Sequence, residues 1–127
     1  MKHTLNTLKV LGEETRLRIF MALVDQELCV CQIVSMLGLA ASTTSKHLAL
    51  MYQAGIIEQR KDGRWAYYSI ASDWIVKNKL HKWLLEELAS SDKIKNDRIK
   101  LARSLKQLAK AGCDHVAGDS TNSEGCC

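Results

Sequence analysis

Five cysteines are the residues of this chain best suited to chemistry, and their spacing divides them into two groups. Cys29 and Cys31 form a C-x-C pair, whereas Cys113, Cys126 and Cys127 lie near the C-terminus. Thiolates are soft ligands that suit thiophilic ions. An odd number of cysteines does not make a closed set of disulfides, so we expect reduced thiols and a site for an ion or a redox signal.

Composition limits the kind of protein that carries these thiols. The 127 residues, of which 46% are hydrophobic, predict one compact domain with appendages. Eighteen Lys and Arg against fourteen Asp and Glu give a net charge of +4, and proline is absent. No apolar run reaches the ~20 residues of a membrane span, and the N-terminus lacks the apolar core of a signal peptide. We therefore expect a cytoplasmic protein with no membrane partner.

Two short helices near the C-x-C pair have the outline of a helix-turn-helix. Apolar periodicity predicts one helix from about Cys29 to Leu37 and a second that begins at about Ser42 and ends at Ala54-Gly55. About four residues containing Gly38 separate them, which is typical of the motif. Their expected core contacts are Ile33, Met36, Leu37, Leu48, Met51 and Tyr52.

A β-hairpin is predicted directly after this helix pair. The β-rich runs 56–61 and 64–70 flank Asp62-Gly63, and Asp-Gly between two such runs is a strong hairpin signal. A hairpin in this position gives a winged helix. The predicted fold class is therefore mainly α with a β-hairpin wing.

A surface for DNA follows from the polar residues of the second helix and of the hairpin. The N-terminal turns of a recognition helix face base edges in the major groove, and cations near a wing tip can reach phosphates. No acidic residue occurs between Leu28 and Ile57. The candidate DNA-binding residues are Ser42, Thr43, Ser45, Lys46 and His47 on the helix, with Lys61 and Arg64 at the hairpin. The alternative is that they only cap and solubilise a surface helix.

The C-terminal half predicts two further helices, over 73–88 and 92–111, each with an apolar stripe. A small winged domain does not easily cover both stripes, which favours a homodimer interface, although these helices could instead fold back on their own domain. We divide the chain into a DNA-binding core (1–72), dimerisation helices (73–111) and a mobile, cysteine-containing tail (112–127).

Four segments of the core together resemble the ArsR/SmtB family of metalloregulatory repressors. They are LGEETRLRI (11–19), STTSKHLAL (42–50), AGII (54–57) and RKDGRW (60–65). The resemblance covers about residues 4–72. It implies a homodimeric winged-helix repressor that leaves operator DNA when it binds an inducing ion. Ala40 stands where relatives often carry a polar residue, so helix capping is expected to fall to Ser42.

The segment ELCVC (27–31) resembles the arsenic-sensing motif of the arsenite-responsive branch of that family. The resemblance implies As(III) or Sb(III) as the inducer, with Cys29 and Cys31 as ligands and no organic cofactor. Those relatives carry a third cysteine three residues after the second, where this chain has Val34. Cys126 and Cys127 could supply the third thiolate from the tail or form a site of their own, with Cys113 a weaker candidate. Alternatively, the pair suffices for a methylated arsenical with two open positions.

Helix geometry suggests how ion binding could release the protein from DNA. Residues i and i+2 lie about 200° apart on a helix, so one ion could bridge Cys29 and Cys31 only if the first helical turn unwound. A coupling of ~1–3 kcal/mol would weaken DNA binding ~5- to 150-fold. The same geometry disfavours a disulfide between them and thus a thiol-redox regulator.

The remaining alternatives are weaker. A C-x-C pair can simply be buried as small hydrophobes. A thiol enzyme is disfavoured because the chain lacks a C-x-x-C on a βαβ framework and a Gly-rich phosphate loop, so we expect no enzyme. A zinc site from His81 with Glu86 or Glu87 has poor spacing for one helical face.

Overall fold

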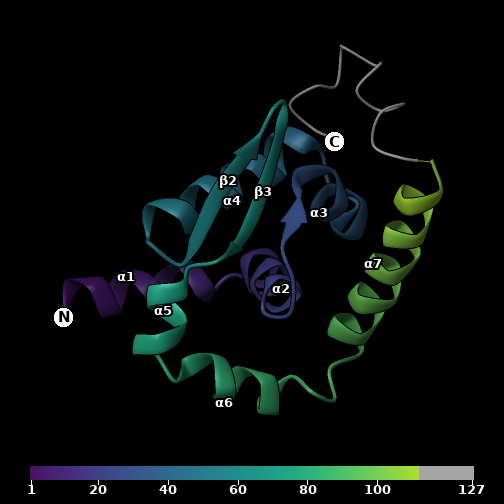
Figure 1. Ribbon diagram of the computed structural model, residues 1–127. Coiled ribbons are helices and arrows are strands. Elements are labelled where there is room, and N and C mark those ends of the chain that lie inside the picture. The colour runs from purple at the N-terminus through teal and green to yellow at the C-terminus, as the bar shows by residue number, and fades with distance from the viewer. Residues whose placement is uncertain (112–127) are drawn as a thin grey trace.

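The computed structural model describes residues 1–111, with side chains at all of these positions except 77 and 104–111. The expected tail, with Cys113, Cys126 and Cys127, lies outside the described residues. Seven helices and three strands follow one another in the described part (Figure 1). In chain order these are α1 (Lys2–Leu11), α2 (Glu14–Leu23), β1 (Leu28–Cys29), α3 (Val30–Leu37), α4 (Ala41–Gln53), β2 (Ile57–Asp62), β3 (Trp65–Ile70), α5 (Ser72–Lys77), α6 (Leu80–Glu87) and α7 (Asp92–Ala111).

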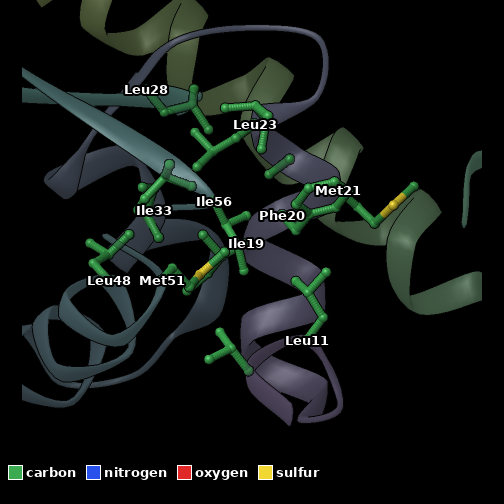
Figure 2. Close-up of a cluster of buried hydrophobic side chains, with 14 of the residues drawn as sticks. Leu11, Ile19, Phe20, Met21, Leu23, Leu28, Ile33, Leu48, Met51 and Ile56 are labelled. Carbon is green, nitrogen blue, oxygen red and sulfur yellow. The ribbon is translucent and has the colours of Figure 1, made fainter. Parts of the chain in front are cut away.

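The helix-turn-helix is formed by α3 and α4. Gly38 ends α3 with a left-handed conformation (φ 69°), which glycine adopts at no steric cost. The apolar faces of α2, α3 and α4 meet the base of the hairpin in one core (Figure 2). Its largest fully buried side chains include Ile19, Phe20, Met21, Leu28, Ile33, Met36, Leu48, Met51 and Ile56. The prediction that Tyr52 joins this core is wrong, because Met51 takes the inward position and Tyr52 is 53% exposed.

The hairpin forms as predicted, but its turn lies one residue later. Asp62 pairs with Trp65, so the two central residues are Gly63 and Arg64 rather than Asp62 and Gly63. Gly63 has a φ of 63°, and within the described residues only glycines have a positive φ. A two-residue turn with a positive φ at its first central position alone requires glycine there.

A third strand was not predicted. The strand β1 pairs antiparallel with β3, so the sheet order is β1-β3-β2. The helix expected from Cys29 begins instead at Val30, and Cys29 is extended, with φ −84° and ψ 163°. Two residues are too short a run for hydrophobic periodicity to reveal.

The single helix expected over 73–88 is two helices, α5 and α6. The chain between them passes through Asn78, whose backbone is extended (φ −116°, ψ 127°). The Asn78 side chain donates to the carbonyl of Trp74 at 3.0 Å, and its own carbonyl lies 2.9 Å from Nδ1 of His81. An asparagine side chain that bonds nearby backbone in this way competes with the helix and interrupts it.

The last helix, α7, lies along α2 and α3 (Figure 1). Ile94 and Leu101 of its apolar stripe are buried there. For these two residues, the alternative that the helix packs on its own domain therefore holds. Asp97, 3% exposed, accepts two hydrogen bonds from Arg18 of α2, at 2.8 and 2.7 Å. Within the described residues, no helix has both the length and the apolar character needed to cross a membrane.

Candidate dithiol site and nucleic-acid interface

Cys29 and Cys31 lie together at the start of α3. Their sulfur atoms are 2.8 Å apart. Cys29 is the N-cap residue, and its extended backbone lets its side chain reach the sulfur of Cys31, the second helical residue. The expectation that the sulfurs lie on opposite sides of a helical turn is therefore wrong, because that 200° separation applies only if both residues are helical. No unwinding is needed to bring the two sulfurs together.

The start of α3 is held in this conformation by its neighbours. The side-chain oxygen of Gln32 accepts from the backbone N–H of Cys29 at 2.9 Å, as the third helical residue does in a capping box. Cys29 is 2% exposed, whereas Cys31 is half-buried. A reagent would therefore approach the pair from the side of Cys31.

A third protein donor is not found beside the pair in the part of the chain that the structure describes. Among residues 1–111, no group of three or more His, Cys, Asp or Glu side chains could hold a metal ion. Val34, in place of a third cysteine, packs against the core. Among the described residues, Cys29 and Cys31 thus bring two sulfur atoms to this site.

Arg60 of the wing contacts the segment that leads into the pair. Arg60 of β2 donates to both carboxylate oxygens of Glu27, at 3.1 and 2.7 Å. The Arg60 guanidinium also lies 4.7 Å from the centre of the Tyr67 ring. The side-chain hydrogen bond from Arg60 lowers the pKa of Glu27, and the same bond raises the pKa of Arg60.

The candidate DNA-reading residues of α4 mostly face solvent. Ser42, Thr43, Ser45 and Lys46 are all exposed in its first two turns. The helix begins at Ala41, with Ala40 as its N-cap. The expectation that Ser42 caps the helix is therefore wrong, because Ser42 lies inside it.

His47 faces the protein rather than solvent. Its Nδ1 lies 3.3 Å from Nη1 of Arg16 and 3.7 Å from a carboxylate oxygen of Glu13. Arg16 also donates to the carbonyl of Val10, at the end of α1. The pKa of Glu13 is lowered: burial acts to raise it, but the backbone N–H groups of Thr15 and Arg16 and the charges of His47 and Arg16 together outweigh burial. This cluster joins α4 to α1 and α2.

Sequence reasoning missed the roles of Arg16 and Glu13, although both lie in the segment 11–19 that carries the family resemblance. The two wing cations, Lys61 and Arg64, are exposed at and beside the turn of the hairpin. His81 contacts the carbonyl of Asn78, which is a structural contact and not the zinc arrangement considered above.

Known proteins similar to this chain agree with its fold. Residues 13–59 match the family model described as "Bacterial regulatory protein, arsR family". The arsenical resistance operon repressor of Escherichia coli K12 is 31% identical over 118 residues, which cover 90% of this chain and 89% of that protein. The cadmium resistance regulatory protein CadC of Lactococcus lactis is 43% identical over 63 residues, 49% of this chain. The chain spans about half of that relative, 53% of its length.

Solved structures show the same architecture. HlyU from Vibrio cholerae matches with a TM-score of 0.64 and 28% identity, over 70% of this chain and 95% of that one. The homodimeric winged helix-turn-helix domain of a possible ArsR-family regulator from Mycobacterium bovis matches with a TM-score of 0.60 and 24% identity, over 69% and 82%. The predicted winged-helix fold is thereby confirmed. With a near full-length relative and a matching family model, this chain belongs to the ArsR family of DNA-binding transcriptional regulators.

Proposed function

We propose that the chain represses transcription from operator DNA as a dimer and dissociates when As(III) or Sb(III) binds Cys29 and Cys31. The observation that carries this proposal is the 2.8 Å separation of the two sulfurs at the start of α3, the first helix of the helix-turn-helix. The similarity to an arsenical resistance repressor over 90% of this chain supports the choice of inducer.

The chemistry of the pair fits a soft, thiophilic ion. Two sulfurs already converge, so little backbone rearrangement is needed for binding, and each ligand must lose its proton. A third sulfur has to come from elsewhere, because Val34 offers no lone pair. Cys126 and Cys127 are the candidates for arsenite, and they lie outside the described residues. A methylated arsenical with two open positions would need only Cys29 and Cys31.

We assign DNA contacts to two exposed groups of residues. On α4, Ser42, Thr43, Ser45 and Lys46 would enter the major groove, where hydroxyl and ammonium groups reach bases and phosphates. Lys61 and Arg64 on the wing would contact an adjacent groove or its phosphates. His47 was also expected to contact DNA, but its contacts with Arg16 and Glu13 favour a role in holding α4 against α2.

The dimer interface is proposed at α1, α5 and α6 rather than at α7. An apolar groove of about 380 Å³ lies between α1, α2 and α6. Leu8 and Trp83, which line this groove, are 52% and 55% exposed in the single chain, and Val76 nearby in sequence is 82% exposed. A second copy of the chain would bury this surface, as apolar patches of this kind require. The groove is lined by Leu8, Leu11, Gly12, Leu17, Leu80, Trp83, Leu84, Glu87 and Leu88.

A gel-shift titration with operator DNA tests the inducer. Under strictly reducing conditions we expect arsenite to release the wild-type protein, and Cys29→Ser and Cys31→Ser variants to remain bound. A Cys113→Ser variant is titrated beside them, and release like that of the wild type would exclude Cys113, the weaker candidate, as a ligand. A parallel titration with cadmium distinguishes the arsenical inducer from the one named for the cadmium resistance relative. Release of a Cys29→Ser/Cys31→Ser double variant as readily as the wild type would contradict the proposal.

Arsenic-edge absorption spectroscopy counts the sulfur neighbours directly. Three sulfurs in the wild type, falling to two in a Cys126→Ser/Cys127→Ser variant, would place the third ligand in the C-terminal segment. Truncation after Thr121 is the matching functional test, since unchanged arsenite affinity and release would remove Cys126 and Cys127 from the site.

A thiol-redox regulator is the second candidate, because the sulfur separation removes the geometric objection to a disulfide between Cys29 and Cys31. Each thiol would lose a proton, and the pair would give two electrons to an oxidant such as a peroxide as the S–S bond forms. One similar solved structure is described as "Reduced HlyU from Vibrio cholerae N16961", at 31% identity and a TM-score of 0.61. Release by oxidant alone, with no effect of arsenite under reducing conditions, would favour this candidate.

A further inference from the structure

Cys29 and the two strands of the wing belong to one sheet. Cys29, the last residue of β1, pairs with Tyr67 of β3, and Tyr67 pairs on its other side with Arg60 of β2. Directly opposed residues of antiparallel strands place their side chains on the same face. The sulfur of Cys29, the ring of Tyr67 and the guanidinium of Arg60 therefore occupy one row across the three strands.

A salt bridge also connects this row to the segment that precedes Cys29. Glu27, two residues before Cys29, accepts both hydrogen bonds from Arg60, and the Arg60 guanidinium lies over the Tyr67 ring. The segment that ends in Cys29 is thus tied to the wing twice, by the backbone pairing with β3 and by Glu27 to β2. The next residue of β2 is Lys61, one of the wing cations assigned to DNA.

We propose that Glu27, Arg60 and Tyr67 are positioning residues that transmit occupancy of the Cys29/Cys31 site to the wing. This inference rests on the proposed function. A change in the position of Cys29 acts on Tyr67 through β1, and it strains or breaks the Glu27–Arg60 pair, so the wing tip changes its orientation toward DNA. The pair suits such a switch because exposed ion pairs stabilise a structure only slightly and are easily exchanged for water.

Transmission through the sheet takes the place of the unwinding of α3 that was expected from the sequence as the cause of DNA release. The sulfurs already meet at a regular helix start, so binding there requires no loss of the first turn. The sheet contacts join the segment that ends in Cys29 directly to the wing, which carries the proposed DNA contacts Lys61 and Arg64. The expected coupling is an ordinary allosteric one, about 5- to 150-fold in operator affinity.

Two variants weaken the Glu27–Arg60 pair without changing the two cysteines or the proposed DNA-contacting residues. Glu27→Gln keeps the shape of the side chain but removes its charge, and Arg60→Lys keeps the wing charge but loses the two-pronged hydrogen bonding. Asp25→Asn is the matched control, because it neutralises another exposed carboxylate, which faces Arg98 at 3.5 Å. Thermal unfolding of each variant verifies that it folds.

Operator affinity is measured with and without arsenite, and arsenite affinity is measured separately by thiolate absorbance. We expect arsenite affinity to stay within about twofold in both variants, as for other exposed ion pairs. We expect the arsenite-induced loss of operator affinity to shrink at least about threefold relative to wild type and to Asp25→Asn. Hydrogen exchange gives the direct readout: arsenite should change exchange in a peptide covering 57–70 in the wild type, and much less in Glu27→Gln.

The outcomes separate the two proposals. If both variants bind arsenite and release operator as the wild type does, or if arsenite alters exchange only within 30–37, the transmission route is wrong while the proposed function stands. If the wild type does not bind arsenite at Cys29 and Cys31, the proposed function is wrong and this inference falls with it.

Discussion

The ion pair between Arg18 and Asp97 gives the sharpest test of how α7 is held on the domain. Asp97 is 3% exposed and accepts two hydrogen bonds from Arg18, whose side chain is itself only 20% exposed. The hydrogen bond to Asp97 also raises the pKa of Arg18. We propose the substitution Asp97→Asn, which preserves the volume of the side chain and therefore leaves no cavity.

The magnitude follows from the contacts. Hydrogen bonds to a charged partner are each worth about 1.5–3 kcal/mol, and roughly half of that is lost when the acceptor becomes neutral. The asparagine amide also turns one acceptor into a donor that faces the Arg18 donors. We expect the free energy of unfolding to fall by about 2–3 kcal/mol, less than the 3–5 typical of fully buried pairs, because Arg18 retains some water. For a chain of this size that corresponds to a fall in Tm of roughly 6–15 °C.

The assay is thermal unfolding followed by circular dichroism, at fixed protein concentration because a dimer makes Tm concentration-dependent. The control is Asp25→Asn, whose carboxylate is exposed and 3.5 Å from Arg98, and it should change the free energy of unfolding by less than about 0.5 kcal/mol. The double variant Arg18→Met/Asp97→Leu should recover most of the loss, since it leaves no unpaired buried charge. If Asp97→Asn is no more destabilising than Asp25→Asn, the reasoning that this pair fixes α7 is refuted.

Three further predictions concern DNA binding, the wing turn and pH. Lys46→Ala should weaken operator binding and lower the slope of log affinity against log salt by about one, whereas Lys95→Ala on α7 should do neither; an unchanged slope for Lys46→Ala would exclude a phosphate contact. Gly63→Ala should lower the free energy of unfolding by about 1–2 kcal/mol, measured by urea denaturation, because φ is 63° there; no loss would mean that the turn adopts another conformation. The pKa of Glu27 is lowered from its ordinary value of 4.5, so the stabilisation from its pair with Arg60 is fully present above that value and lost as pH falls through the lowered pKa. The Tm values of wild type and Glu27→Gln should therefore differ at pH 7 and converge in acid, and a constant difference would contradict this assignment.

Local patterns determined much of this fold. Gly38 ends α3 and Gly63 lies in the wing turn, because each position requires a positive φ that glycine provides. The alternation of apolar residues at helical spacing correctly placed Ile33, Met36 and Leu48 in the core. These features depend on residues a few positions apart, which the chain order alone specifies.

The tertiary structure decided the features that depend on distant residues. Cys29 is extended rather than helical where it pairs with Tyr67, 38 positions later, and this extended backbone lets its sulfur reach that of Cys31. Likewise, Asp97 is buried because it meets Arg18, 79 positions earlier. The residue types were sufficient to predict a cysteine pair and a winged helix. They did not predict the strand pairing that connects Cys29 to the wing. Hydrophobic periodicity is a local signal, whereas strand pairing and a buried ion pair form only when the whole chain has folded.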